Sequence, residues 1–279
     1  MKVRWLLEED TFEENLEDLQ KAITAQGMEC KMAKYVPFDG MSFSKTYLAS
    51  LEDCIISYGS LGMIKQVTKK TCWVPGAWCN LDHFKCSYYY PRLAKYLLND
   101  RYFMLPYGEL LRQKENLFRA LNPDGLELFM RPDSGYKTFT GKVIERNEEE
   151  YRKDIEFFGF YDVEPEALVI VAEPKQIKEE WRLVVVNQQV ITSSQYKDSG
   201  KVCVREGCPQ EVLDLGNEIA AVWQPDRCFV IDICRTKDEL KLVEINSLSC
   251  SGLYACDKMK FVEAVSAAAI EEWEEYHEC

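Results

Sequence analysis

Three side chains near the C-terminal end of the sequence, Asp232, Glu244 and Asn246, are spaced so that they could bind a metal ion together. They lie in or directly after two apolar runs, Phe229–Ile233 and Leu240–Ile245. Apolar runs separated by a short polar segment are typical of a β-hairpin. A turn midway between the runs sets Asp232 opposite Glu244, and side-chain alternation puts Asn246 on the same face.

Two carboxylates that face each other across a strand pair repel, and burying them unpaired is costly. A divalent cation would remove both problems, and a ligand set made only of oxygen atoms suits magnesium. The alternative is an ordinary solvated hairpin face. The hairpin alone does not decide between these two interpretations.

A second polar stretch connects two expected strands, Leu126–Arg131 and Lys142–Ile144. It contains two glycines and small hydroxyl residues, and the cations Arg131, Lys137 and Lys142 lie in or beside it. Such a loop can bring backbone N–H groups and positive charge to phosphates. It lacks the ending of a Walker loop, and a plain surface hairpin is the alternative.

Arg182 lies in a second expected hairpin, formed by residues 180–186 and 189–196. A two-residue turn at positions 187–188 would place Arg182 opposite Ser193 and Glu180 opposite Gln195, all on one face. The planar fork of donors on an arginine suits phosphate or carboxylate.

The twelve cysteines do not indicate a disulfide framework, because the chain is neither small nor visibly secreted. We expect most of them to be reduced and packed. A zinc set formed by Cys72, Cys79, His83 and Cys86 has poor spacing. A catalytic role for Cys250 lacks an evident activating histidine.

The composition is that of a globular protein, with 47% hydrophobic and 29% charged residues among 279. The net charge of −13 argues against nucleic acid or an anionic membrane as the main partner. No apolar run approaches transmembrane length, and we expect a cytoplasmic protein. Alternating strand, helix and strand patterns over the first 95 residues predict an α/β fold.

Five segments in their order along the chain resemble the ATP-grasp superfamily. They span roughly residues 116–260 and read FMRPDSGYKTFTGKV, VIVAEPK, EEWRLVVV, FVIDI and LVEIN. Arg131 stands where the family usually carries lysine before Pro132. With EWR and SSQY, this resembles a divergent clade that includes the eukaryotic cell-division-cycle factor that assembles translation initiation factor two.

The resemblance implies a pre-ATP-grasp-like domain at residues 1–95 and an ATP-grasp domain at residues 96–279. It also implies a role for each matching residue. Nucleotide binding would involve Arg131, Lys137, Ala172, Glu173, Pro174, Lys175 and Glu180. Magnesium would be held by Asp232, Glu244 and Asn246, and catalysis would depend on Arg182 and Lys137.

The implied activity is an ATP- and magnesium-dependent carboxylate–amine ligase that forms ADP and an acyl-phosphate. Its substrates would be a carboxylate and an amine, each a small molecule, a peptide or a protein. Two alternatives remain at this point: a non-catalytic ATP-binding assembly factor for a protein partner, and a phosphotransferase.

Overall fold

The computed structural model describes residues 1–36, 53–135, 138–159, 161, 163–237 and 239–278. The chain packs into two compact units, one formed by Met1–Asn80 with Lys178–Cys279 and the other by Leu81–Ile177. The α/β fold class is confirmed. The expected domain boundaries, residues 1–95 and 96–279, stay a prediction. The two packed units divide the chain after Asn80 and again after Ile177.

The N-terminal part of the first unit is a four-stranded parallel sheet in the order β2-β1-β3-β4. Its elements are β1 (Val3–Glu8), α1 (Glu13–Ala25), β2 (Glu29–Ala33), β3 (Cys54–Tyr58), α2 (Leu61–Lys70) and β4 (Val74–Gly76). The helix α1 connects the parallel strands β1 and β2, and the helix α2 connects β3 and β4, as the strand–helix–strand pattern predicts.

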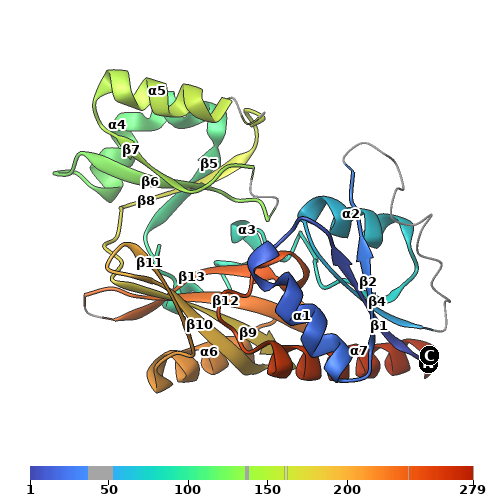
Figure 1. The fold of residues 1–279 in the computed structure, drawn as a ribbon. Helices are drawn as coiled ribbons and strands as arrows, with labels where there is room; N and C mark the ends of the chain where they lie inside the picture. The colour runs from blue at the N-terminus through green and yellow to red at the C-terminus, as the bar shows by residue number, and fades with distance from the viewer. Residues whose placement is uncertain (37–52, 136–137, 160, 162, 238, 279) are drawn as a thin grey trace. The chain divides into compact units, whose positions relative to one another are not determined.

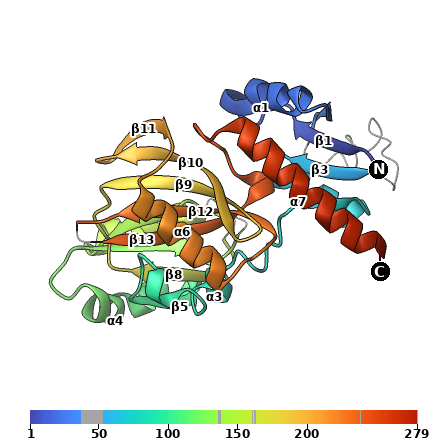
Figure 2. The same cartoon turned by 90° about the horizontal axis from the view of Figure 1, so that it is seen from below.

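The second sheet of this unit has five strands in the order β11-β10-β9-β12-β13. The strands are β9 (Glu179–Val186), β10 (Gln189–Asp198), β11 (Lys201–Glu206), β12 (Cys228–Arg235) and β13 (Leu240–Ser247). The helix α6 (Gln210–Val222) packs on this sheet (Figure 2). The 3₁₀ turn η3 (Leu248–Cys250) follows β13. Strand β9 is the central strand, and all of its residues except Glu179 are buried.

An apolar core joins the two sheets of the first unit. The helix α7 (Lys258–Glu278) contacts α1, β3, β4, β9 and β10. The core contains Trp5 from β1, Val184 from β9, Val230 from β12 and Phe261 from α7, each fully buried. Burial of large apolar side chains on this scale is the main force that fixes the strands carrying the polar residues described below.

The second unit contains one antiparallel sheet, β5-β8-β6-β7, on which the helices α4 and α5 pack. Its elements are α3 (Cys86–Tyr89), η1 (Ala94–Tyr96), β5 (Tyr102–Pro106), η2 (Tyr107–Glu109), α4 (Leu110–Leu121), β6 (Glu127–Pro132), β7 (Lys142–Glu145), α5 (Glu148–Gly159) and β8 (Leu168–Ala172). Figure 1 shows α4 and α5 side by side over this sheet. The two strands expected on either side of the phosphate-type loop are β6 and β7.

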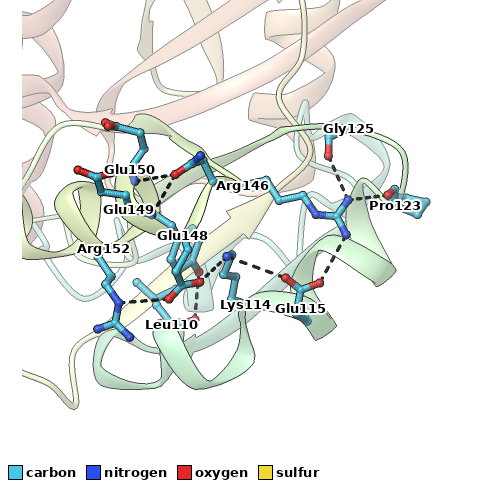
Figure 3. A network of polar contacts seen from close by, with 12 residues as sticks. Leu110, Lys114, Glu115, Pro123, Gly125, Arg146, Glu148, Glu149, Glu150 and Arg152 are labelled. Atoms are coloured by element: carbon cyan, nitrogen blue, oxygen red, sulfur yellow. Dashed lines mark hydrogen bonds and ion pairs between the residues drawn. The ribbon is translucent and has the colours of Figure 1, made fainter.

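A polar network fixes the start of α5 against α4 (Figure 3). Lys114, only 8% exposed, places its Nζ 2.6 Å from the Glu148 carboxylate. Asn147 Oδ1 accepts hydrogen bonds from the backbone N–H groups of Glu149 and Glu150, which caps the helix in the way that asparagine commonly does. Arg146 donates to the Pro123 carbonyl oxygen at 2.8 Å. These contacts hold α5 next to the end of β7.

The predicted register between β9 and β10 is wrong. Arg182 pairs with Ser194, not Ser193, and Glu180 pairs with Lys197, not Gln195. Irregularities between Val190 and Thr192 and between Gln195 and Lys197 each insert an extra residue into β10. A β-bulge shifts the pairing by one residue beyond it, which a simple count from the turn cannot include.

Candidate active site

The predicted hairpin is formed by β12 and β13, with Asp232 directly opposite Glu244. Asn246 lies on the same face, as expected from the alternation along β13. Its Nδ2 donates to Glu244 Oε1 at 2.8 Å and lies 3.4 Å from Asp232 Oδ2. The structure therefore brings the three predicted metal ligands into direct contact with one another.

Arg182 joins this group from the neighbouring strand β9, where it is the cross-strand partner of Asp232. Its Nε donates to Asp232 Oδ1 at 2.9 Å and its Nη2 to Asp232 Oδ2 at 2.8 Å. Its Nη1 donates to the Gly252 carbonyl oxygen at 2.9 Å. This is a bidentate pair, the geometry that makes arginine–carboxylate contacts strong and directional.

The ion pair is almost completely shielded from water, with Arg182 7% and Asp232 1% exposed. Burial alone would lower the pKa of Arg182, but the facing Asp232 carboxylate outweighs it, and the pKa of the guanidinium is raised above its ordinary value. The repulsion expected between two facing carboxylates is therefore partly relieved by an arginine. The charges of Arg182, Asp232 and Glu244 together still sum to one negative charge.

The resemblance implies a magnesium ion here, and the side chains present offer the oxygen donors that such an ion needs. An ionised carboxylate offers about four lone-pair positions, so Asp232 keeps acceptor capacity beside its two bonds to Arg182. Glu244 is partly exposed, and rotation of the Asn246 amide would present its oxygen. Two carboxylates and an amide oxygen fit magnesium, which commonly completes its shell with water and phosphate oxygens. No cluster of three or more His, Cys, Asp or Glu side chains suited to a metal occurs among the described residues.

Two tyrosines that the sequence interpretation did not assign cover the Arg182 guanidinium. The rings of Tyr196 and Tyr254 stack with centroids 5.0 Å apart, and Arg182 Cζ lies 5.0 Å from the Tyr254 ring. Tyr196 donates to Glu180 Oε2 at 2.7 Å, and burial, Asp232 and Glu180 raise the pKa of that phenol. Tyr196 belongs to the SSQY segment that resembles the family. The direction of its side chain could not be predicted, because the bulge in β10 changes the side-chain alternation at this position.

Glu180, one of the predicted nucleotide contacts, is buried and bound on both carboxylate oxygens. Its Oε1 lies 2.8 Å from Lys197 Nζ, and its Oε2 accepts from Tyr196. Glu180 and Arg182 alternate with the apolar Trp181 along β9, so both lie on the face that carries Asp232. Glu180 therefore belongs to the same polar layer as the candidate metal ligands.

The hydroxyl-rich segment after β13 is bound to its own unit. Ser247 Oγ donates to the Trp78 carbonyl oxygen at 2.7 Å, and Ser249 Oγ accepts from the Trp78 N–H at 3.1 Å. Ser251 Oγ donates to the Ser247 carbonyl oxygen at 2.6 Å. Together with the bond from Arg182 to Gly252, these contacts fix the backbone beside the ion pair.

The remaining predicted nucleotide contacts belong to the second unit. Arg131 lies on β6 and pairs with Ile170 of β8, and Ala172 ends β8 opposite Phe129. The next three predicted contacts, Glu173, Pro174 and Lys175, follow outside any strand, and Lys175 Nζ lies 3.0 Å from the Glu173 carboxylate. Lys137 lies outside the described residues.

The chain's family follows from its sequence. The profile of the ATP-grasp domain, R2K clade family 2, matches residues 113–264, which is more than half of the chain. The chain belongs to this ATP-grasp family. The expected membership in a divergent ATP-grasp clade is confirmed. The likeness to the eukaryotic assembly factor stays a prediction. No curated protein matches the ATP-grasp chain.

Solved structures share its fold over almost the whole length. D-cycloserine synthetase DcsG has a TM-score of 0.66 at 14% identity, covering 96% of this chain and 99% of its own. D-alanine–D-alanine ligase from Bacillus anthracis, complexed with ATP, has a TM-score of 0.62 at 10% identity, covering 99% of each chain. The ATP-grasp ligase PsnB, with minimal precursor, Mg and ADP, has a TM-score of 0.59 at 12% identity, covering 96% of this chain and 98% of its own. At these identities the likeness shows the ATP-grasp ligase fold.

The described part of the ATP-grasp chain contains no helix with the length and hydropathy needed to cross a membrane.

Proposed function

We propose that the protein is an ATP- and magnesium-dependent carboxylate–amine ligase that forms ADP and passes through an acyl-phosphate. The observation that carries the proposal is the contact cluster of Arg182, Asp232, Glu244 and Asn246 in a chain of the ATP-grasp family. These four side chains converge from three adjacent strands. They combine a fixed cation with an oxygen-rich metal donor set.

Magnesium would be held by Asp232, Glu244 and Asn246, and when bound it would draw charge from the phosphate oxygens of ATP. Arg182 uses three of its five N–H groups on Asp232 and Gly252 within the described residues, which leaves donors for a phosphoryl oxygen. Because the guanidinium is already oriented, it needs no rearrangement as charge develops on the γ-phosphoryl group.

The other predicted residues would bind the nucleotide. Arg131 and Lys137 would hold the phosphates of ATP. Adenine would meet the backbone of the segment Ala172–Lys175, with Glu173 or Lys175 adding a side-chain contact, and Glu180 would also contact the nucleotide. These assignments follow from the family motif, position by position.

The substrates we propose are a carboxylate and an amine, either small molecules or groups on a peptide or protein. The fold neighbours support both sizes, because one is named as a D-alanine–D-alanine ligase and another was solved with a precursor peptide. The net charge of −13 does not favour nucleic acid or an anionic membrane. All eleven cysteines that the structure describes are free, which fits a cytoplasmic protein.

A trapping assay tests the ligase. With ATP, magnesium, hydroxylamine and a panel of amino acids and short peptides, we expect one carboxylate to yield a hydroxamate together with ADP and phosphate, detected by mass. Turnover of ATP without a carboxylate should be slow, because the reaction depends on two reactants held within reach of each other.

The alternatives give different results in the same assay. A phosphotransferase would release a stable phosphorylated product that hydroxylamine does not divert. An assembly factor would bind a protein partner more tightly with ATP and form no covalent product. Formation of AMP, or no hydroxamate from any carboxylate of a broad panel, would contradict the ligase.

A further inference from the structure

Two thiols in the first unit contact each other although they are 171 residues apart along the chain. Cys79 Sγ lies 4.0 Å from Cys250 Sγ, a contact in which either thiol can donate. Cys79 is 9% exposed, whereas Cys250, in the turn η3, is partly exposed. Neither thiol has a role in the ligase chemistry described above.

The backbone on both sides of this contact is held in place. Trp78 exchanges hydrogen bonds with Ser247 and Ser249, and the Asn80 N–H donates to Asp226 Oδ2 at 3.0 Å. The Gly59 N–H donates to the Ser249 carbonyl oxygen at 2.9 Å. Because the residues next to each thiol are fixed, the two sulfur atoms stay close rather than meeting by chance.

The surroundings distinguish the two thiols. The contact with Cys250, the Ser247 hydroxyl and the Lys65 ammonium together lower the pKa of Cys79, although burial and Asp226 act in the opposite direction. The contact with Cys79 and burial raise the pKa of Cys250. The thiolate is the reactive form of cysteine, so Cys79 is the better nucleophile of the pair.

We propose that Cys79 and Cys250 form a redox-sensitive dithiol that a peroxide converts to a disulfide. The Cys79 sulfur loses its proton and attacks one oxygen of hydrogen peroxide; the O–O bond breaks, and the departing hydroxide takes the proton to give water. Cys79 is now a sulfenic acid. The Cys250 sulfur then attacks it, the S–O bond breaks, and the departing hydroxide takes the Cys250 proton as a second water. Two thiols are oxidised and one peroxide is reduced.

The bond requires the sulfur atoms to approach by about 2 Å, since a disulfide is about 2 Å long. It would tie the turn η3 to the segment that contains Trp78. This turn follows the strand of Glu244 and Asn246, so slower turnover that dithiothreitol restores is also expected, and this consequence alone rests on the proposed ligase.

Peptide mapping tests the dithiol without reference to activity. The reduced full chain is treated with hydrogen peroxide, blocked with an alkylating agent and digested without reductant. We expect a linked peptide pair containing Cys79 and Cys250, and the intact chain measured before blocking should be lighter by two hydrogen atoms. Treatment with dithiothreitol should reverse both signals.

Variants identify the role of each thiol. In Cys250→Ser, dimedone should label Cys79 as a trapped sulfenic acid, and no linked pair should form. In Cys79→Ser, labelling at Cys250 should be much weaker. Cys72→Ser, which removes an exposed thiol outside the pair, should leave the linkage unchanged. If the wild-type chain gives no Cys79–Cys250 peptide while Cys72 becomes oxidised, the proposal is wrong.

Discussion

Replacement of Arg182 with lysine is expected to lower ATP turnover about 10²-fold while changing ATP affinity much less. Lysine keeps the positive charge but loses the rigid fork that binds both Asp232 oxygens and the Gly252 carbonyl oxygen. A flexible ammonium group cannot hold one orientation toward a phosphoryl oxygen. The measurement compares the rate of ADP formation with the dissociation constant of ATP.

Arg131→Lys is the matched control, because it makes the same chemical change on β6. It restores the residue that the ATP-grasp family carries more commonly, so we expect a mild effect on both turnover and affinity. If Arg131→Lys lost turnover and Arg182→Lys did not, the roles of the two arginines would have to be exchanged.

Asp232→Asn is expected to destabilise the first unit as well as to impair magnesium-dependent ATP binding. Removing one partner of a buried ion pair typically costs about 3–5 kcal/mol, because the other charge stays buried without compensation. Asparagine keeps one acceptor for Arg182, so we expect a loss toward the lower end of this range. Urea denaturation measures the free energy of unfolding.

A double variant separates the ion pair from other effects of this substitution. Arg182→Met with Asp232→Asn removes the stranded charge, so the double variant should lose less stability than the two single losses added together. Strictly additive losses would show that the buried contact between Arg182 and Asp232 contributes little to the folded state.

The hairpin that carries the candidate metal ligands could be predicted from the sequence because its pairing is local. Two apolar runs with a short polar segment between them fix the register near the turn, and Asp232 does face Glu244. The bulge between Asp232 and Ile233 lies on the turn side of this pair. The centre assumed for the turn nevertheless gave the correct partner for Asp232.

The contact between Arg182 and Asp232 could not be predicted in the same way. It depends on β9 lying next to β12, although β10, β11 and α6 intervene along the chain. Composition and alternation show that each strand has a polar position, but they do not determine strand order in the sheet. The extra residues in β10 are also the reason why the predicted partners of Arg182 and Glu180 were wrong.

Some strands of the second unit could be predicted from the sequence, and one could not. The strands β6 and β7 agree with the expected strands Leu126–Arg131 and Lys142–Ile144 to within about two residues, the usual uncertainty of element ends. Strand β5 (Tyr102–Pro106) was missed, because a short run that ends in proline gives a weak strand signal. The division into packed units could not be read from the sequence, since α7 brings the C-terminal part of the chain onto the N-terminal sheet.

The most direct test of the candidate site is the effect of magnesium on ATP affinity in the wild-type chain and in Glu244→Gln. Glu244 is partly exposed on the edge strand β13, so this change removes a charge without stranding Arg182. Calorimetric titration should show tighter ATP binding with magnesium for the wild-type chain. We expect Glu244→Gln to lose this gain while its free energy of unfolding stays close to the wild-type value. An equal magnesium-dependent gain in both proteins would contradict the assignment of the site.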